Sequence, residues 1–541
     1  MLDTIFCIQE QLETREEPLN FTTSTLKSFL LVTIYALVSL CPAQTAVHAT
    51  GSGTATDPFH IDSLPNLQWL TTDSTVWSKV FVQGKDIDAS ITSTWDGGAG
   101  FTPIGHYGYK KATFRGQYHG SGHTITGLTI NRPSTDLIGL FSYMEYGSVD
   151  SLSLQSASII GRNAVGAIVG FTNIAHFKYI NASGTVQGLD TIGGLIGFSG
   201  GDTILNSIVS VQVTGKYEVG GFIGIARGIN FSIKSNWATG NTIGFFDVGG
   251  FVGNNNAHLT HDSASGNVTG AVDVGGFAGT NASFLSNVRA SGTVISDTGY
   301  NAGGLVGYNT EYGYIIESYA TGAITGIIRV GGLVGLNNGD VEDCYSTGAV
   351  TGINAVGGIE GGGAGNTCGS IWYSYATGKI TTPSKSMQVG GVDGDPWNCS
   401  GQKDYNSFWD TTTSGITVDA FSKGLSDSAM KVQASYGGWG FTCIWKMDGS
   451  YPILRQFTND TCIPAPVALH NQVQTGGSWV SVTRSTLLYN NLHGHAVLVN
   501  LNGSVVASFE AKGAGLQPLF VQPGFYVLRS QGFAQQIQLG R

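Results

Sequence analysis

Charged residues are scarce in this sequence of 541 residues: they make up 11% of it, whereas 41% of the residues are hydrophobic and 80 are glycine. Lysine and arginine form no cluster and the net charge is -10, so the basic surface that nucleic-acid binding requires is missing. The chain also lacks the Leu, Ala, Glu and Lys richness that long helices need. The composition therefore argues against a helical protein and against nucleic acid as a partner.

Long apolar runs are lacking after residue 49, where no stretch approaches the roughly 20 residues of a membrane span. Before that point, the apolar stretch Phe29–Leu40 follows Lys27 and precedes the small residues of Val47–Ala49. This order is typical of a secretory signal peptide. We therefore expect residues 1–49 to be removed, and the mature chain to be secreted or held at the outer cell surface without a membrane span.

Cysteines are few, and no Cys-x-x-Cys is present among them. The mature chain would keep five, namely Cys344, Cys368, Cys399, Cys443 and Cys462. This pattern does not favour a metal centre built from thiolates. Two disulfides are candidates, Cys344 with Cys368 and Cys443 with Cys462, and free cysteines are the alternative.

Glycine and valine are instead arranged in an internal repeat. A hexapeptide that reads VGGLVG in its clearest copy recurs nine times at a nearly constant spacing of 26 to 33 residues. Its copies begin at Val165, Ile192, Val219, Val248, Val274, Ala302, Val330, Val356 and Val389. Most copies are followed by a SYATG-like segment and then by a short piece such as AVTG. Each unit therefore offers two or three short strands separated by glycine and asparagine turns.

A single unit of this kind cannot bury its apolar face, because an isolated strand pair is only marginally stable in water. Stacking the units at the strand spacing of about 4.8 Å would place equivalent side chains in columns and merge the apolar positions into one core. The sequence therefore predicts an all-β fold. We expect a parallel β-solenoid, right-handed by the usual chirality of such crossovers, of about nine coils of roughly 27 residues.

One asparagine recurs at the same place in four consecutive repeats, two residues after the hexapeptide. The four are Asn255, Asn281, Asn309 and Asn337. If they point inward, each side-chain amide can bond the one above and the one below, and can satisfy backbone groups at the turn. We predict a structural asparagine column.

The repeats, which read VGGLVG-x-N and then SYATG-x-V-x-G, closely resemble the GLUG-motif proteins of secreted bacterial adhesins and surface proteins. Further segments are similar to that family's entry and closing regions: GSGTATDPF from residue 51, FRGQYHGSGHTITGL from 114, IGLF from 138, FWDTTTSG from 408 and SYPIL from 450. His119 stands where the family would have an aspartate. The resemblance implies the solenoid architecture more firmly than any activity.

The chain divides into six expected parts. Residues 1–49 are the signal peptide region, 51–160 an N-terminal cap with atypical coils, 161–395 the repeat solenoid, 396–462 its closing segment, 463–484 a linker, and 485–541 a small antiparallel β-sandwich. A short helical or irregular turn is expected near Leu64–Leu70. The last part, with PGFYVLR and QQIQLG, resembles type IX secretion sorting domains, which implies contact with secretion machinery; an ordinary β-domain is the alternative.

Three acids stand directly before the hexapeptide in consecutive repeats: Glu218, Asp247 and Asp273. Stacked about 4.8 Å apart, they would raise one another's pKa or attract a cation such as Ca²⁺. The alternative is a solvated row of turn residues that binds nothing. Apart from this calcium, no cofactor is expected.

A second column precedes the SYATG glycine by three residues and holds Trp237, Tyr319, Tyr345 and Tyr375. If exposed, such an aromatic ladder would offer flat faces to sugar rings, and if buried it is core packing. The residue directly before the same glycine is always Thr or Ser, which predicts one hydroxyl row. Ice binding would need several such rows on one flat face, so strand propensity explains this one.

Catalytic candidates are poor. His119 and His123 are separated by a Gly-Ser-Gly turn and not by a helix, so they do not predict a zinc pair. We therefore expect a non-enzymatic adhesin or polymer-binding protein whose partner is a polysaccharide or a cell-surface ligand. The alternatives are a carbohydrate-active β-helix enzyme that uses acids such as Asp247 and Asp273, and a structural spacer or ice-binding-type protein.

Overall fold

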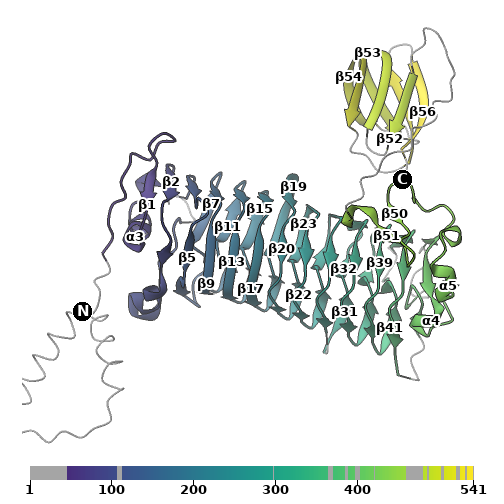
Figure 1. Cartoon of the computed structure of the whole chain (residues 1–541), viewed down its shortest axis with the longest axis horizontal. Coiled ribbons are helices and arrows are strands. Elements are labelled where there is room, and N and C mark those ends of the chain that lie inside the picture. The colour runs from purple at the N-terminus through teal and green to yellow at the C-terminus, as the bar shows by residue number, and fades with distance from the viewer. Residues whose placement is uncertain are drawn as a thin grey trace, which may run out of the picture. The chain divides into compact units, whose positions relative to one another are not determined.

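The computed structural model is built from short parallel β-strands that stack along one axis (Figure 1). It describes residues 45–541 apart from 107–112, 297, 364–368, 384–387, 396–402, 420, 459–478, 484–485, 501–504, 519–523, 531–532 and 540–541. The chain forms two units. The first contains the chain up to residue 439 together with 447–458, and the second contains 440–446 and 459–541.

Each repeat coil of the first unit runs through three sheets. The coil that contains the clearest hexapeptide comprises β36 (Ile328–Gly331), β37 (Val334–Asn337), β38 (Asp340–Glu342), β39 (Tyr345–Ser346) and β40 (Val350–Thr351). We call sheet 1 the sheet of β37 and β38, sheet 2 that of β36, and sheet 3 that of β39 and β40. Every coil thus bends between three strand directions.

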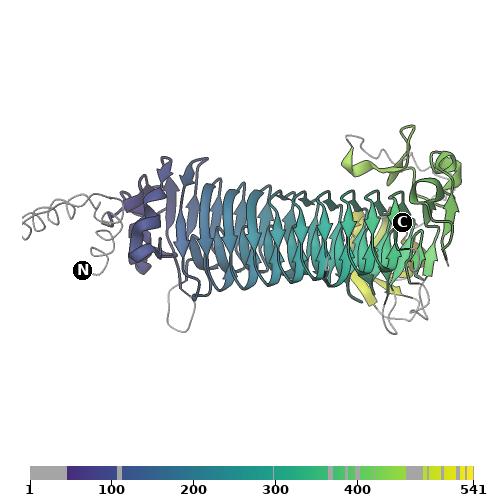
Figure 2. The same ribbon diagram turned by 90° about the horizontal axis from the view of Figure 1, so that it is seen from below.

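Sheet 2 contains nine parallel strands in chain order, one from each hexapeptide, and Figure 2 shows the coils side by side. This confirms the predicted solenoid of about nine coils. The strands are β10 (Asn163–Val165), β14 (Asp190–Gly193), β18 (Tyr217–Gly220), β22 (Phe246–Gly249), β26 (Val272–Gly275), β31 (Tyr300–Gly303), β36, β41 (Asn354–Gly357) and β46 (Val389–Gly390).

Sheets 1 and 3 each contain 20 strands and extend beyond the repeats. Sheet 1 runs from β1 (Phe59–Ile61) to β47 (Lys403–Tyr405), and sheet 3 from β3 (Ile87–Asp88) to β49 (Lys423–Leu425). β1 already pairs in parallel with β2 (Val80–Gln83). The stack therefore includes segments of both flanking parts, outside the expected range 161–395.

The core consists of columns of identical or similar side chains. The fourth hexapeptide position gives Phe222, Phe251 and Phe277, which are fully buried and stack with ring centroids 4.7 and 4.8 Å apart. Two coils further on, Leu333 occupies the same position and is also fully buried. A constant period keeps this register, because a shift by one residue would turn every apolar side chain outward.

Tight contact between coils explains the paired glycines. A Cβ on Gly332 would lie 2.0 Å from the carbonyl oxygen of Gly358 in the next coil, so no other residue fits there. The residue before each of the first eight hexapeptides forms a corner with left-handed backbone although none of the eight is glycine. These corner residues, with φ between 51 and 63°, are Ala164, Thr191, Glu218, Asp247, Asp273, Asn301, Arg329 and Ala355.

The N-terminal end is covered by α3 (Leu64–Thr72), which confirms the helical turn expected there. Of the predicted signal region the structure describes residues 45–49, where Val47 and His48 contact this cap, and the boundary at residue 49 stays a prediction. The Val47 amide donates to the carbonyl of Pro65 at 3.0 Å, and the His48 ring lies 4.2 Å from that of Trp69. The rest of the predicted signal peptide, residues 1–44, lies outside the described residues.

The other end carries α4 (Thr411–Ser414) and α5 (Asp427–Met430). Met447–Thr458, which we call the return segment, comes back to the solenoid after these helices. Among the described residues, no helix is long and apolar enough to cross a membrane.

The second unit contains a single five-stranded antiparallel sheet in which the long strand β53 pairs with three others. Antiparallel strands were expected here, and the hydrogen bonding joins them in one path whose two end strands, β52 and β56, contact each other. The first strand also begins inside the expected linker 463–484. The strands are β52 (Trp479–Thr483), β53 (Thr486–Asn500), β54 (Val505–Pro518), β55 (Gly524–Ser530) and β56 (Phe533–Leu539).

Candidate functional site

The outer face of sheet 3 is built by strict alternation along the SYATG segment and the short strand after it. Ala320, Gly322 and Ile324 are buried, whereas Thr321 and Thr325 are exposed. Because alternate residues of a strand point to opposite sides, every coil presents four side chains to solvent here. In chain order, the first position holds aromatic or other side chains and the second a hydroxyl side chain. The third position varies, and the fourth holds a hydroxyl side chain or isoleucine.

One hydroxyl row runs along this face from Thr239 through Ser265 to Thr377, as predicted. A second row lies four residues further along each coil, on the same face, and mixes threonine with isoleucine. This second row was not predicted from the sequence. Its members, paired in register from coil to coil, are Thr214, Ile243, Thr269, Ile295, Thr325, Thr351 and Thr381.

The same face is almost uncharged. Over the seven coils from Ile208 to Thr381, its outward positions include two charged residues, Arg289 and Lys379. Hydroxyl, amide and apolar side chains fill the others. Such a surface suits a neutral ligand with hydroxyl groups better than a charged polymer.

Trp237 is the exposed aromatic residue of this face. It is 43% exposed, and its indole Nε1 donates to Ser265 Oγ at 3.2 Å in the next coil. The strand residue beside Trp237 in that coil is Ser263, which is small and buried. The indole therefore extends over the neighbouring coil and keeps a large apolar surface in contact with solvent.

Polar groups around Trp237 are held in place by contacts between coils. Ser210 Oγ lies 2.7 Å from Thr239 Oγ1, and the Arg289 guanidinium donates through Nε to Ser263 Oγ at 2.9 Å. Asn241 Oδ1 accepts from the backbone of the following coil at 2.9 Å, which aligns its amide along the axis. An aromatic surface with fixed hydrogen-bonding groups around it has the chemistry that binds sugars.

The tyrosines of the same column do not offer the flat faces that the ladder hypothesis required. Tyr319 and Tyr345 stack with centroids 4.7 Å apart and planes 6° apart, and Tyr345 and Tyr375 at 5.2 Å and 8°. Nearly parallel rings this close cover one another's faces. Tyr375 is 1% exposed, so for these three positions the structure favours packing, which the sequence left open as the alternative.

The return segment closes over this tyrosine ladder. The Phe457 ring meets Tyr319 edge-on with centroids 4.7 Å apart, and the Tyr375 hydroxyl donates to the carbonyl of Pro452 at 2.7 Å. Gln456 Nε2 donates to the backbone of Glu317 at 2.7 Å. A segment distant in sequence thus decides which aromatic residues of the column remain exposed.

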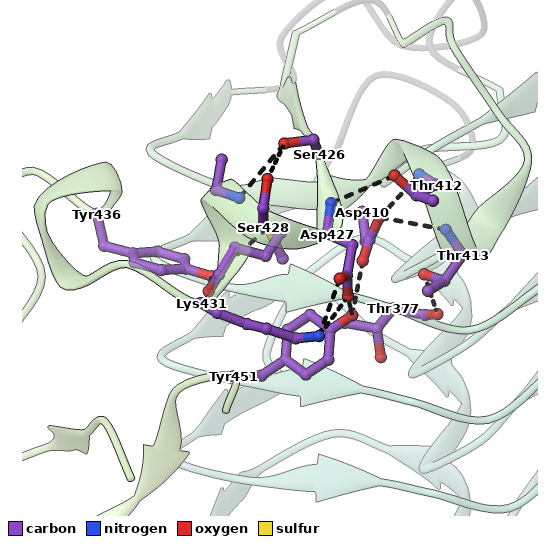
Figure 3. A network of polar contacts seen from close by, with 12 residues as sticks. Thr377, Asp410, Thr412, Thr413, Ser426, Asp427, Ser428, Lys431, Tyr436 and Tyr451 are labelled. Carbon is purple, nitrogen blue, oxygen red and sulfur yellow. Dashed lines mark hydrogen bonds and ion pairs between the residues drawn. The ribbon is translucent and has the colours of Figure 1, made fainter. Parts of the chain in front are cut away.

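A polar network fixes the return segment to the two terminal helices (Figure 3). The Tyr451 hydroxyl donates to Asp410 Oδ2 at 2.6 Å and contacts Asp427 Oδ1 at 2.8 Å. Asp410 also accepts the amides of Thr412 and Thr413 as the N-cap of α4. Lys431 pairs with Asp427, so each carboxylate of the network has a donor.

The acid row lies at the corner residues and is partly withdrawn from water. Desolvation raises the pKa of Glu218 to about 7 and that of Asp273 to about 6, and it also raises the pKa of Asp247. Each carboxylate accepts from a neighbour: Glu218 from Thr191 at 3.0 Å, Asp273 from Asn301 at 2.7 Å, and Asp247 from the hydroxyl of Thr280. The row is therefore not simply a solvated turn.

A cation such as calcium was one of the two expectations for this row. Within the described part of the chain, no group of three His, Cys, Asp or Glu residues is placed to hold a metal ion together. Calcium at Glu218, Asp247 and Asp273 stays an untested prediction.

The asparagine column is present as predicted. Asn255 Nδ2 donates to Asn281 Oδ1 at 2.8 Å, and the pairs Asn281 to Asn309 and Asn309 to Asn337 follow at 2.9 Å each. All four are fully buried. The Asn255 Oδ1 also accepts the backbone amide of Ala257 at 3.1 Å, so the column satisfies turn groups inside the core.

The cysteines differ from one of the two predicted pairings. Cys344 is a free, fully buried thiol whose Sγ lies 3.1 Å from the carbonyl oxygen of Glu342, so a disulfide with Cys368 is wrong. Cys443 is in a disulfide. Its predicted partner Cys462, like Cys368 and Cys399, lies outside the described residues.

His119 and His123, which the sequence analysis weighed as a zinc pair, contact different acidic residues. His119 Nδ1 lies 2.6 Å from Asp150 Oδ2, and His123 Nδ1 lies 3.2 Å from Asp86 Oδ1. Each pair joins neighbouring coils of the solenoid. His119 and His123 therefore do not converge on one point.

Comparisons with known proteins agree with the repeat. The family model described as the GLUG motif matches residues 298–325 and 326–351. Halomucin of Haloquadratum walsbyi is 40% identical over 147 residues, which are 27% of this chain, and a candidate Gly-rich membrane protein of Evansella cellulosilytica is 33% identical over 147 residues, 26% of this chain. The matches fit a surface-type repeat protein.

These relatives are far longer than the matched region, which covers 2% of halomucin and 16% of the second protein. A solved structure from Bacteroides ovatus, described as a candidate immunoglobulin A1 protease, is 17% identical with a TM-score of 0.23, over 75% of this chain and 94% of that chain.

Proposed function

We propose that this chain is a non-catalytic, secreted or cell-surface β-solenoid that binds a neutral polysaccharide along the outer face of sheet 3. The observation that carries the proposal is Trp237, an indole that is 43% exposed and fixed across two coils by its bond to Ser265. Sugar rings stack on aromatic surfaces, and a preformed indole loses little conformational freedom on binding.

The surroundings of Trp237 support the same ligand class. Hydroxyl groups at Ser210, Thr239 and Ser265 can exchange hydrogen bonds with sugar hydroxyls, and Asn241 adds an amide. The scarcity of charge on this face disfavours an acidic or basic polymer. Because the coils repeat these groups at a fixed step, a chain of sugars can contact several coils at once, which raises its overall affinity.

The proposed location rests on the chain's own signal-like segment and on the names of its relatives, one a mucin and the other a membrane protein. The C-terminal strands resemble type IX sorting domains, and we propose that they serve export or attachment. A surface location places the solenoid where extracellular polysaccharides are found.

Binding to insoluble cellulose and chitin, used as probes of neutral polysaccharide, tests the proposal. The full chain should be retained, and Trp237→Ala should weaken retention about two- to twelvefold, since one stacking contact contributes roughly 0.5 to 1.5 kcal/mol. The matched control is Tyr312→Ala, which removes an aromatic residue that is 75% exposed but lies elsewhere.

Three outcomes would overturn the proposal. Equal retention of the Trp237→Ala variant would remove sheet 3 from the binding surface. Retention of neither probe, nor of any soluble glucan on an affinity gel, would favour a structural spacer. Release of reducing ends or unsaturated products from the probes would show a carbohydrate-active enzyme.

A further inference from the structure

A second surface of the solenoid, the outer face of sheet 2, carries an apolar column that the repeat pattern alone did not indicate. It stands two residues before the hexapeptide, and register pairs its members coil by coil. They are Tyr217, Phe246, Val272, Tyr300 and Ile328. None is fully buried, and Tyr300 is 50% exposed.

The next column outward widens this surface. Leu189 and Phe245 are each 44% exposed, and Ile353 is 52% exposed. The first column is apolar in five consecutive coils, and the second extends the apolar surface, here called the stripe, over seven coils, about 29 Å at the usual strand spacing, although Lys216 and Gly299 also stand in the second column. Scattered apolar side chains are normal on a protein surface, but a column of them in consecutive coils marks an interaction site.

Charges beside the stripe are separated by sign along the axis. The corner column contains Glu218, Asp247 and Asp273 in three consecutive coils, then Asn301, and then Arg329. Within the described part of the chain, the Arg329 guanidinium has no hydrogen bond or ion pair, although the residue is only partly exposed. An arginine in this state gains from an acidic group brought by a partner.

We propose that the outer face of sheet 2 binds a second copy of this chain, antiparallel to the first, about a twofold axis at Val272. The proposal concerns a different sheet from the polysaccharide face and does not depend on that function. A twofold contact requires a surface that complements itself. If one residue of the first copy contacts another residue of the second copy, the same contact forms again with the two copies exchanged.

The stripe meets this requirement around the coil of Val272. Two coils on either side are Tyr217 and Ile328, and one coil on either side are Phe246 and Tyr300. At the ends of the stripe, Leu189 and Ile353 are three coils from the same point. Each of these residues would therefore face an apolar residue of the second copy, whereas in the second column Phe245 would face Gly299 and Lys216 would face Ile327.

The corner column is complementary under the same operation in the coils on either side of the axis. Glu218 lies two coils before the axis and Arg329 two coils after it, so Glu218 of one copy would face Arg329 of the other. Asp247 would likewise face Asn301, and Asp273, in the coil of the axis, would face its own counterpart. A parallel arrangement would instead place the three acids beside three acids, which is unfavourable.

Sedimentation of the full chain across a range of concentrations tests for the dimer, and a cysteine at the axis tests its geometry. Val272→Cys should form a disulfide-linked dimer under mild oxidation, because the two copies of residue 272 meet at the axis. Tyr312→Cys, at an exposed turn away from the stripe, is the matched control and should crosslink at least about tenfold more slowly.

Reversing the two charges of the proposed ion pair distinguishes this contact from non-specific association. Arg329→Glu should weaken the dimer about tenfold or more by placing acid against acid, and the double variant Arg329→Glu with Glu218→Arg should restore it. Circular dichroism of each variant confirms that the solenoid is intact. A monomeric wild type at all concentrations, or a double variant as weak as the single one with both folded, would overturn the proposal.

Discussion

Asp262 shows how a single buried residue can make the stability of the solenoid depend on pH. It is fully buried, its Oδ1 accepts from the backbone and side chain of Asn236, and desolvation raises its pKa to about 8. In the unfolded chain an aspartate titrates near its usual pKa of about 3.9. Between these two values the folded protein binds more protons than the unfolded one, so stability falls as the pH rises from about 4 to about 8.

Asp262→Asn should therefore stabilise the solenoid at pH 8 by an amount on the order of a few kcal/mol and flatten this part of the pH dependence. The asparagine keeps the Oδ1 acceptor that Asn236 uses. Melting temperatures of both proteins at pH 5 and pH 8 measure the effect. A variant that loses stability equally at both pH values would contradict the assigned protonation.

Leu333→Asp tests the inward face. Leu333 is fully buried in the core column, so an unpaired charge there should cost at least about 4 kcal/mol and lower the melting temperature sharply. Tyr312→Asp, at a residue that is 75% exposed, is the control and should leave the melting curve almost unchanged. An unchanged curve for Leu333→Asp would mean that the register is wrong.

Residues whose environment repeats could be predicted from the sequence, and those whose environment does not repeat could not. The asparagine column and the inward Leu333 follow from the period alone, because register fixes the face of every strand residue. Trp237 and Tyr345 belong to the same column, yet their exposure depends on the non-repeating return segment. No pattern in the repeats indicates where that segment lies.

Among the elements, the return segment depends on very few contacts. The Tyr451 hydroxyl links it to Asp410, which is fully buried, and to Asp427 (Figure 3). Tyr451→Phe should destabilise this segment by about 1 to 3 kcal/mol, because it leaves a buried carboxylate oxygen without its donor.

Hydrogen exchange of the amides of Met447–Thr458 measures this effect. Exchange there should become roughly tenfold faster or more, while amides of the solenoid core keep their protection. Tyr179→Phe, at a residue that is 50% exposed, serves as the control. Uniform loss of protection across all coils would mean that the segment does not open separately.

The number of strands in a coil also lay beyond sequence analysis. Glycines and threonines separate the pieces of each repeat, but they do not reveal that one coil contributes five strands to three sheets. Similarly, the parallel stack begins at β1, where the sequence no longer repeats. There the pairing depends on backbone hydrogen bonds that many different side chains allow.

For the whole solenoid, stability should be close to a sum over coils and their contacts. Deleting Ile192–Glu218 removes one complete period and joins Thr191 to Val219, which takes the place of Ile192, its register partner in the preceding coil. This variant should fold and melt within several degrees of the parent. Deleting Ile192–Leu205, about half a coil, is the control and should disrupt folding, because it removes the sheet 1 strands Ile196–Gly200 and Thr203–Leu205 and leaves the strands of both neighbouring coils without their partners. Circular dichroism separates the two.

The left-handed corner has a wider consequence. Its backbone is held by adjacent coils, and the eight residues found there include small, hydroxyl, amide, acidic and basic side chains, so chemistry at this position is uncoupled from folding. Duplication of coils can thus lengthen the solenoid, while later substitutions change the corner side chain of each coil independently. Moving a single coil to another position in the stack should move its corner side chain with it and leave the fold intact.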